Sequence, residues 1–187
     1  MLYFAYGSNL HLDSMAGRCP DAKPLGKFYL GDARLVFRGV ADCLYEKGSR
    51  CPGGLWRITP KCEAALDRYE GVGSGFYRKV YAPLAEEIDG ENEVMLYVMN
   101  SSGIYPPSKG YLDCLIRGYK DFKLPKRPLM AAVRDAFERK NPTHVERQRL
   151  RRHGNPPLAR MPSPEAAGLK TGSPKTGNLF GFQEESA

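Results

Sequence analysis

The stretch MLYFAYGSNL, residues 1–10, decides how the rest of the sequence is interpreted. Its first half, residues 1–5, is short, apolar and aromatic, and the turn formers YGSN (6–9) follow it directly. This pattern predicts a buried strand that ends in a tight loop. Backbone N–H groups in such a loop can hold a carboxylate or a developing oxyanion. The loop is therefore a candidate ligand site, although an ordinary strand-to-helix turn has the same composition.

Alternating helix and strand patterns continue to about residue 140. We expect Asn9 to cap a short helix in which Leu12, Met15 and Ala16 have helical spacing. The remaining predicted helices begin after Thr59, after Ser108 and at about residue 127. The predicted strands are 26–37, 53–58, 77–84 and 93–99, and the first of them has a bend or bulge at Gly31. The connection 38–52 is expected to carry one more short strand. Helices inserted between non-adjacent strands predict an α+β fold with a small mixed sheet or barrel.

The length of 187 residues suits one domain and a tail. We place the domain at residues 1–140 and a basic, Pro/Gly-rich, poorly ordered tail at 141–187. The net charge of +7 is concentrated in residues 126–160, which hold ten basic and three acidic side chains. Arginines at 147, 149, 151 and 152 form a dense cluster without neighbouring aromatic residues, so a nucleic-acid partner is not expected. The first 125 residues are nearly balanced in charge.

The five cysteines include no C-x-x-C pair, and only three histidines occur. We interpret the cysteines as reduced thiols and expect neither a disulfide framework nor a metal site. No apolar run is long enough for a membrane span, and the N-terminus lacks the pattern of a signal peptide. A cytoplasmic protein with no membrane partner is the prediction.

Glu70 is the second candidate functional residue. It follows the apolar face of a predicted helix and precedes the flexible stretch GVGSG (71–75). A carboxylate at a helix C-terminus meets the unfavourable end of the helix dipole, and burial would raise its pKa further toward the range of a general acid or base. A solvated glutamate at a helix end is the alternative interpretation.

Five segments, in this order and at this spacing, resemble the γ-glutamylcyclotransferase (AIG2-like) family. They are YFAYGSNL (3–10), GGLW (53–56), LDRYEGV (66–72), GFYRK (75–79) and PSKGY (107–111). The resemblance extends over about residues 1–125. It implies a small mixed β-barrel with flanking helices and a cavity at the barrel's mouth.

The resemblance also implies an enzyme that cleaves a γ-glutamyl amide to 5-oxoproline and a free amine or amino acid, with no cofactor or metal. Glu70 matches the family's catalytic glutamate. The positions that match substrate-binding residues are Tyr3, Tyr6, Gly7, Ser8, Asn9, Tyr77 and Tyr111. Asn9 makes the loop more similar to the general γ-glutamyl branch than to the glutathione-specific one. Tyr69 departs from the family pattern, which has a small or polar residue there in many members.

Two other functions remain open at this stage. The same cavity could belong to a non-catalytic module that binds a small carboxylate, or the arginine cluster could be the functional element with the domain as its scaffold. The sequence does not identify the leaving amine or the oligomeric state.

Overall fold

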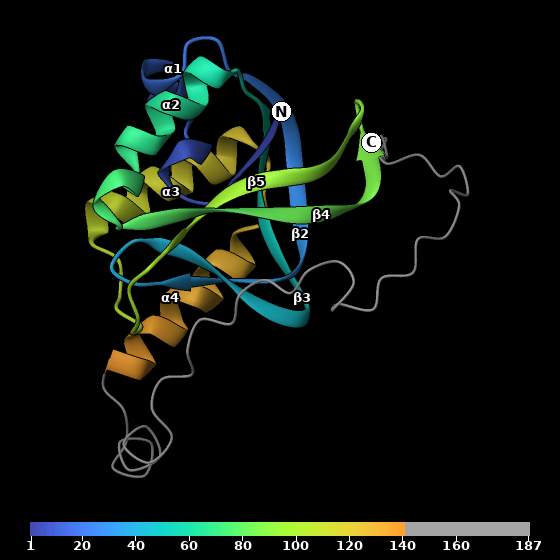
Figure 1. Cartoon of the computed structure of the whole chain (residues 1–187). Coiled ribbons are helices and arrows are strands. Elements are labelled where there is room, and N and C mark those ends of the chain that lie inside the picture. Colours follow the sequence, from blue (N-terminus) through green and yellow to red (C-terminus); the bar gives the residue numbers. More distant parts are fainter. Residues whose placement is uncertain (141–187) are drawn as a thin grey trace, which may run out of the picture.

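Residues 1–140, which the computed structural model describes, form a five-stranded mixed sheet with four α-helices packed around it (Figure 1). The strands are β1 (Leu2–Ala5), β2 (Lys23–Phe37), β3 (Ala41–Arg57), β4 (Tyr77–Ile88) and β5 (Glu91–Met99), the helices are α1 (Leu12–Arg18), α2 (Pro60–Tyr69), α3 (Lys109–Asp121) and α4 (Lys126–Lys140), and two 3-10 turns are η1 (Ser8–Leu10) and η2 (Val72–Ser74). The predicted tail, 141–187, and its arginine cluster lie outside the described residues.

The short strand β1 is the centre of the sheet, whose strand order is β2-β3-β1-β5-β4. It pairs antiparallel with β3 and parallel with β5, so Tyr3 lies opposite both Trp56 and Met95. All four of its residues are buried, as its continuous apolar sequence predicts for a strand covered on both faces. The chain therefore leaves β1 at the end of a central strand, which places residues 6–9 over the core.

The predicted α+β class with a mixed sheet is confirmed, but the sheet is open. In the described part of the chain, β2 and β4 are its two edges and do not pair with one another. Figure 1 shows the long strands β2 and β3 bending around the core, with helices on the concave side. The curvature gives a barrel-like shape, but no ladder closes it.

The hairpin of β2 and β3 corrects one prediction. Residues 38–52 are not a connection with a short strand, because β3 begins at Ala41, opposite Phe37, and continues to Arg57, opposite Lys23. The exposed polar residues of its middle part hide the alternation expected of a strand. A register shift between Gly31 and Ala33 confirms the bulge predicted near Gly31.

Two helix starts agree with their capping signals, and one does not. The side chains of Thr59 and Ser108 each accept a hydrogen bond from the backbone N–H three residues later, at 3.2 Å, as N-cap residues do. Asn9, however, is wrong as a cap. Helix α1 begins after His11, and Asn9 lies within η1 with its side chain buried.

Two helices complete the packing. Helix α4 packs against β2, where Arg34 and Asp135 form an ion pair at 3.4 Å. Helix α3 packs against η1 through Gly118, where a Cβ atom would lie 2.5 Å from the Cβ of Leu10 and 2.8 Å from its carbonyl carbon. Among residues 1–140, no helix has the length and apolar content of a membrane span.

Gly118→Ala should therefore destabilise the domain, although alanine is the better helix former. The added methyl group meets backbone atoms that cannot move without displacing η1, and overpacking of this kind costs about 1–3 kcal/mol. Gly110→Ala on the same helix is the matched control, because a Cβ at Gly110 contacts nothing within 4 Å. Urea unfolding of both variants measures the difference. Equal stability of the two variants would contradict the close contact between α3 and η1.

Candidate active site

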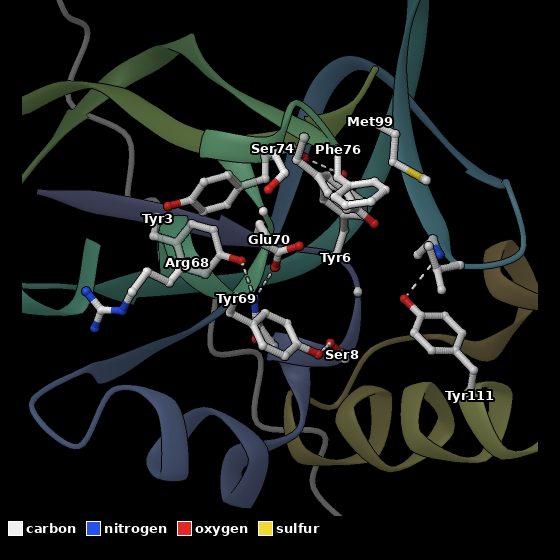
Figure 2. Close-up of a pocket in the computed structure, with 17 residues that line it drawn as sticks. Tyr3, Tyr6, Ser8, Arg68, Tyr69, Glu70, Ser74, Phe76, Met99 and Tyr111 are labelled. Carbon is white, nitrogen blue, oxygen red and sulfur yellow. Dashed lines mark hydrogen bonds between the residues drawn. The ribbon is translucent and has the colours of Figure 1, made fainter. Parts of the chain in front are cut away.

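A cavity of about 580 Å³ opens at the end of β1, and all eight residues predicted for the site line it (Figure 2). They are Glu70, Tyr3, Tyr6, Gly7, Ser8, Asn9, Tyr77 and Tyr111. The other lining residues are Val40, Ala41, Arg68, Tyr69, Gly71, Ser74, Phe76, Tyr97 and Met99. Segments separated by more than 100 residues in the sequence thus meet at one hollow.

Local backbone signals aim Glu70 into this cavity. Glu70 is the C-cap residue of α2 and its N–H donates to the carbonyl of Leu66 at 2.8 Å. Gly71 follows with φ of 65°, a left-handed conformation that glycine adopts without strain. The chain therefore turns sharply after α2, and the carboxylate points inward instead of continuing along the helix surface.

Asn9 connects Glu70 to the wall of the cavity. It is only 3% exposed, and its Nδ2 donates to Glu70 Oε1 at 3.0 Å and to the Tyr3 hydroxyl at 2.8 Å. Its Oδ1 accepts from Arg18 Nη1 at 3.0 Å. The buried amide is thus bonded on both sides, as a buried polar group requires. The Tyr3 hydroxyl acts as an acceptor in its bond with Asn9, so its own proton can be donated elsewhere.

The pKa of Glu70 is raised from 4.5 to about 7. Burial is the dominant cause because it disfavours the charged carboxylate. The hydrogen bond from Asn9 and the positive charge of Arg18 oppose that effect and lower the pKa. The prediction of a raised pKa agrees with this result. A carboxyl group that titrates near neutrality is able both to accept and to return a proton.

The opposite wall is built around Tyr111. Its hydroxyl accepts a hydrogen bond from the backbone N–H of Ala41 at 3.1 Å, which leaves its own proton available to a ligand. A Cβ atom on Gly7 would lie 3.1 Å from that hydroxyl. The absence of a side chain at Gly7 therefore lets the loop after β1 approach the tyrosine closely.

The loop itself has two backbone donors that the internal bonds of η1 do not use. Within η1 the N–H of Leu10 donates to the Gly7 carbonyl at 3.0 Å and the N–H of His11 to the Ser8 carbonyl at 3.2 Å. These bonds do not use the N–H groups of Ser8 and Asn9, which stand at the N-terminal end of the turn, where helical turns leave donors without internal partners.

Two ion-pair networks behind the cavity were not found by the sequence interpretation. Asp42 and Arg38 form a buried pair at 2.7 Å, and Asp42 also accepts from the hydroxyl of Tyr6 at 3.4 Å. Asp67 accepts from the hydroxyl of Tyr97 at 2.7 Å and pairs with a lysine of β4. Both networks hold tyrosines that line the cavity.

Arg18 is the most informative of the missed residues. It contacts Asn9, and its Nη2 donates to the Tyr69 hydroxyl at 2.8 Å while the guanidinium carbon lies 3.8 Å from the centre of the Tyr69 ring. Because α1 and α2 are far apart in the sequence, no local spacing signals this contact. Among residues 1–140, no three His, Cys, Asp or Glu side chains converge as a metal site would require. The cofactor-free site stays a prediction.

Comparisons with known proteins agree with this arrangement. Residues 51–129 match the model of the AIG2-like family. The γ-glutamylcyclotransferase of Homo sapiens is 30% identical over 136 residues, which are 66% of this chain and 72% of that protein. The protein of the same name from Mus musculus is 30% identical over 137 residues, 67% of this chain and 73% of its own length. A solved γ-glutamyl cyclotransferase structure has a TM-score of 0.59 and 28% identity, and the match covers 66% of this chain and 80% of that one.

Glu70→Gln should stabilise the folded protein above pH 7. A carboxyl whose pKa rises from 4.5 to about 7 on folding stabilises the protein below pH 4.5, and that contribution is lost as the pH rises through 7. A neutral glutamine avoids the loss, so the variant should gain about 1–3 kcal/mol at pH 8, after allowance for partial solvent screening, and nothing at pH 4. Urea unfolding at the two pH values measures this. A pH-independent difference would contradict the raised pKa, and Glu87→Gln, at an exposed position of β4, is the control.

Proposed function

This chain belongs to the γ-glutamylcyclotransferase family, and on that premise we propose that it cleaves a γ-glutamyl amide to 5-oxoproline and a free amine or amino acid, with Glu70 as the general acid and base. The observation that carries the proposal is a carboxyl group with a pKa of about 7 inside the cavity, bonded to Asn9. The cleavage is a lyase reaction in the sense that no water enters the product.

The first step forms a bond between the substrate's α-amine nitrogen and its γ-carbonyl carbon. The amine is protonated near neutral pH, so a base must remove a proton before its lone pair can attack. The Glu70 carboxylate accepts that proton. As the C–N bond forms, the carbonyl π electrons move to the oxygen and give a tetrahedral oxyanion.

The second step breaks the amide bond. Glu70 returns that proton to the amide nitrogen, the oxyanion collapses to a carbonyl, and the amine leaves with the bonding electron pair. The ring nitrogen still carries two hydrogens and a positive charge after the attack, and it gives one proton to Glu70. Glu70 passes this proton to the released amine, so the products are a neutral lactam and an ammonium ion. One carboxyl thus serves both steps, which suits a pKa close to the working pH. General acid–base assistance of this kind contributes about 10²- to 10⁴-fold to the rate.

Two further effects need no nucleophilic side chain. Because the attack is intramolecular, a site that folds the glutamyl chain so that amine and carbonyl meet makes use of effective molarities of about 10⁵–10⁸ M. The N–H groups of Ser8 and Asn9 and the hydroxyl of Tyr111 are the proposed donors to the oxyanion. Each such donor is worth about 3–4 kcal/mol when it is aimed at the developing charge.

The other predicted residues form the proposed glutamyl pocket. Tyr3, Tyr6, Gly7 and Tyr77 line the part of the cavity around Glu70. The hydroxyl of Tyr6 already directs its proton at Asp42 and the carbonyl of Tyr97, so Tyr6 shapes the pocket. The phenols of Tyr3 and Tyr77 supply hydrogen-bond donors without charge, because burial raises the pKa of each hydroxyl. They are therefore suited to the carboxylate and carbonyl oxygens of a glutamyl group, and they do not compete with Glu70 for the amine proton.

We also propose a cytoplasmic location and a site that works without a cofactor. All five cysteines lie in the described part of the chain as free thiols, four of them buried. Free thiols suit a reducing compartment. The general γ-glutamyl branch remains the proposed specificity, because Asn9 is present in the loop.

Glu70→Gln should reduce 5-oxoproline release from γ-glutamyl substrates by at least about 10²-fold, because an amide cannot accept the amine proton. A panel of γ-glutamyl amino acids and γ-glutamyl amines, assayed by chromatography of 5-oxoproline, measures this and identifies the leaving group. Glu87→Gln serves as the control and should retain activity.

Two outcomes separate the alternatives. Full activity of Glu70→Gln would contradict the role of Glu70 as the general acid and base. Thermal stabilisation of the wild-type protein by the panel compounds, without any 5-oxoproline, would instead support a non-catalytic module that binds small carboxylates.

A further inference from the structure

We propose that Arg18 is a positioning residue for Glu70. Its guanidinium fixes the orientation of the Asn9 amide, and the fixed amide presents two N–H donors to the carboxylate and to Tyr3. The inference rests on the proposed function, in which Glu70 moves the proton. It assigns a role in that reaction to a residue outside the cavity lining.

The chemistry of the two groups determines which side of the amide faces Glu70. A guanidinium has five N–H donors and no acceptor, so only an acceptor can face it. Arg18 Nη1 lies 3.0 Å from Asn9 Oδ1, and Nδ2 is thereby turned toward Glu70 Oε1 at 3.0 Å. The position of the Arg18 guanidinium thus determines that the amide donates a hydrogen bond to the Glu70 carboxylate.

Tyr69 holds the arginine in place. The Tyr69 hydroxyl accepts from Arg18 Nη2 at 2.8 Å and lies 3.3 Å from the Ser8 hydroxyl, while the guanidinium carbon lies 3.8 Å from the ring centre. A hydrogen bond and a cation–π contact therefore fix the guanidinium at two points. Tyr69, which departs from the family pattern and directly precedes Glu70 in the chain, thus holds Arg18 in place.

Without Arg18 the amide has two orientations to choose from. With Oδ1 turned toward Glu70, two oxygens face one another, which is unfavourable for the carboxylate and favourable for the protonated acid, whose O–H can donate. Loss of Arg18 therefore stabilises the protonated form of Glu70. Removal of the positive charge acts in the same direction.

The remaining titratable groups that face Glu70 are neutral. They are Tyr3 and Tyr6 from β1 and the following loop, Tyr77 from β4 and Tyr111 from α3. Arg18 from α1 is the cation that lowers the pKa of Glu70. Arg68 of α2 also lines the cavity, but Figure 2 shows its guanidinium pointing away from the Glu70 carboxylate, and the cation that shifts the pKa of Glu70 is Arg18. Loss of Arg18 should consequently move the titration of Glu70 to higher pH.

The experiment measures the pH dependence of kcat/KM for 5-oxoproline release by Arg18→Met, which keeps an apolar stem and removes the charge and the donors. Its acidic midpoint reports the free enzyme. We expect that midpoint to rise by about one pH unit or more, with recovery of activity at high pH. Arg117→Met, at an exposed position of α3 that does not line the cavity, is the matched control and should show the wild-type midpoint.

A second variant tests whether the effect passes through Asn9. In an Asn9→Ala background, Arg18→Met should shift the midpoint less than it does in the wild-type background, because no amide remains to be turned. An equal shift in both backgrounds would show that Arg18 acts only as a charge and would contradict the positioning role. A lower kcat/KM at every pH with an unshifted midpoint would contradict it as well.

A ligand-free measurement keeps this test separate from the proposed function. The difference in unfolding free energy between proteins with and without Glu70→Gln depends on pH with a midpoint at the Glu70 pKa. Arg18→Met should raise that midpoint too, even if no substrate of the panel is cleaved. Arg18→Gln, which is also neutral, replaces Arg18→Met if the latter does not fold, and an unshifted ligand-free midpoint overturns the proposal.

Discussion

The buried side chain of Asn9 is the interaction on which the site depends. Its three hydrogen bonds join the central strand to two helices: Tyr3 from β1, Arg18 from α1 and Glu70 at the end of α2. None of these bonds forms unless β1 is buried in the sheet and η1 is held by α3. An unmade hydrogen bond costs more free energy at a side chain that is 3% exposed than at one in contact with water. Once the core has formed, conformations that satisfy the Asn9 amide are therefore strongly favoured.

The same burial that organises the site raises its free energy. Glu70 is placed where its charged form is disfavoured, and the domain gives up stability at neutral pH to keep it there. Asn9 and Arg18 limit that loss, because they favour the carboxylate while the surroundings favour the acid. The balance brings the pKa to about 7, between a carboxyl too basic to stay charged and one too acidic to accept a proton. A trade-off between stability and activity is expected of catalytic groups.

Sequence interpretation identified the residues that line the cavity more reliably than the contacts between them. Thr59 and Ser108 are caps whose signals lie within four residues, so the helix starts followed from local rules. Asn9 is of a residue type that often caps helices, but its side chain bonds to Tyr3, Arg18 and Glu70 instead of to the backbone of α1. The last part of β3 agrees with the predicted strand 53–58, but residues 41–52 have the pattern of a connection, because the middle of β3 is exposed and lacks alternation. The open sheet was not distinguished from a barrel because both share the same strand pattern. Arg18 had no local signal, since its partners come from another helix and the loop before it.

The inner part of the cavity and its rim contact different parts of the proposed substrate. In the proposed reaction, Glu70 and the loop of residues 6–9 act on the glutamyl half, whose chemistry is the same for every substrate. Phe76, with 68% of its surface exposed, and the half-exposed Tyr69 stand at the rim, where the leaving amine has to extend. On this proposal, substitutions at the rim should change which amine is accommodated and leave the proton transfer unaltered. Tyr69 is a special case because it also anchors Arg18. A change there reaches both the rim and Glu70, which links the choice of leaving group to the pH range of the reaction.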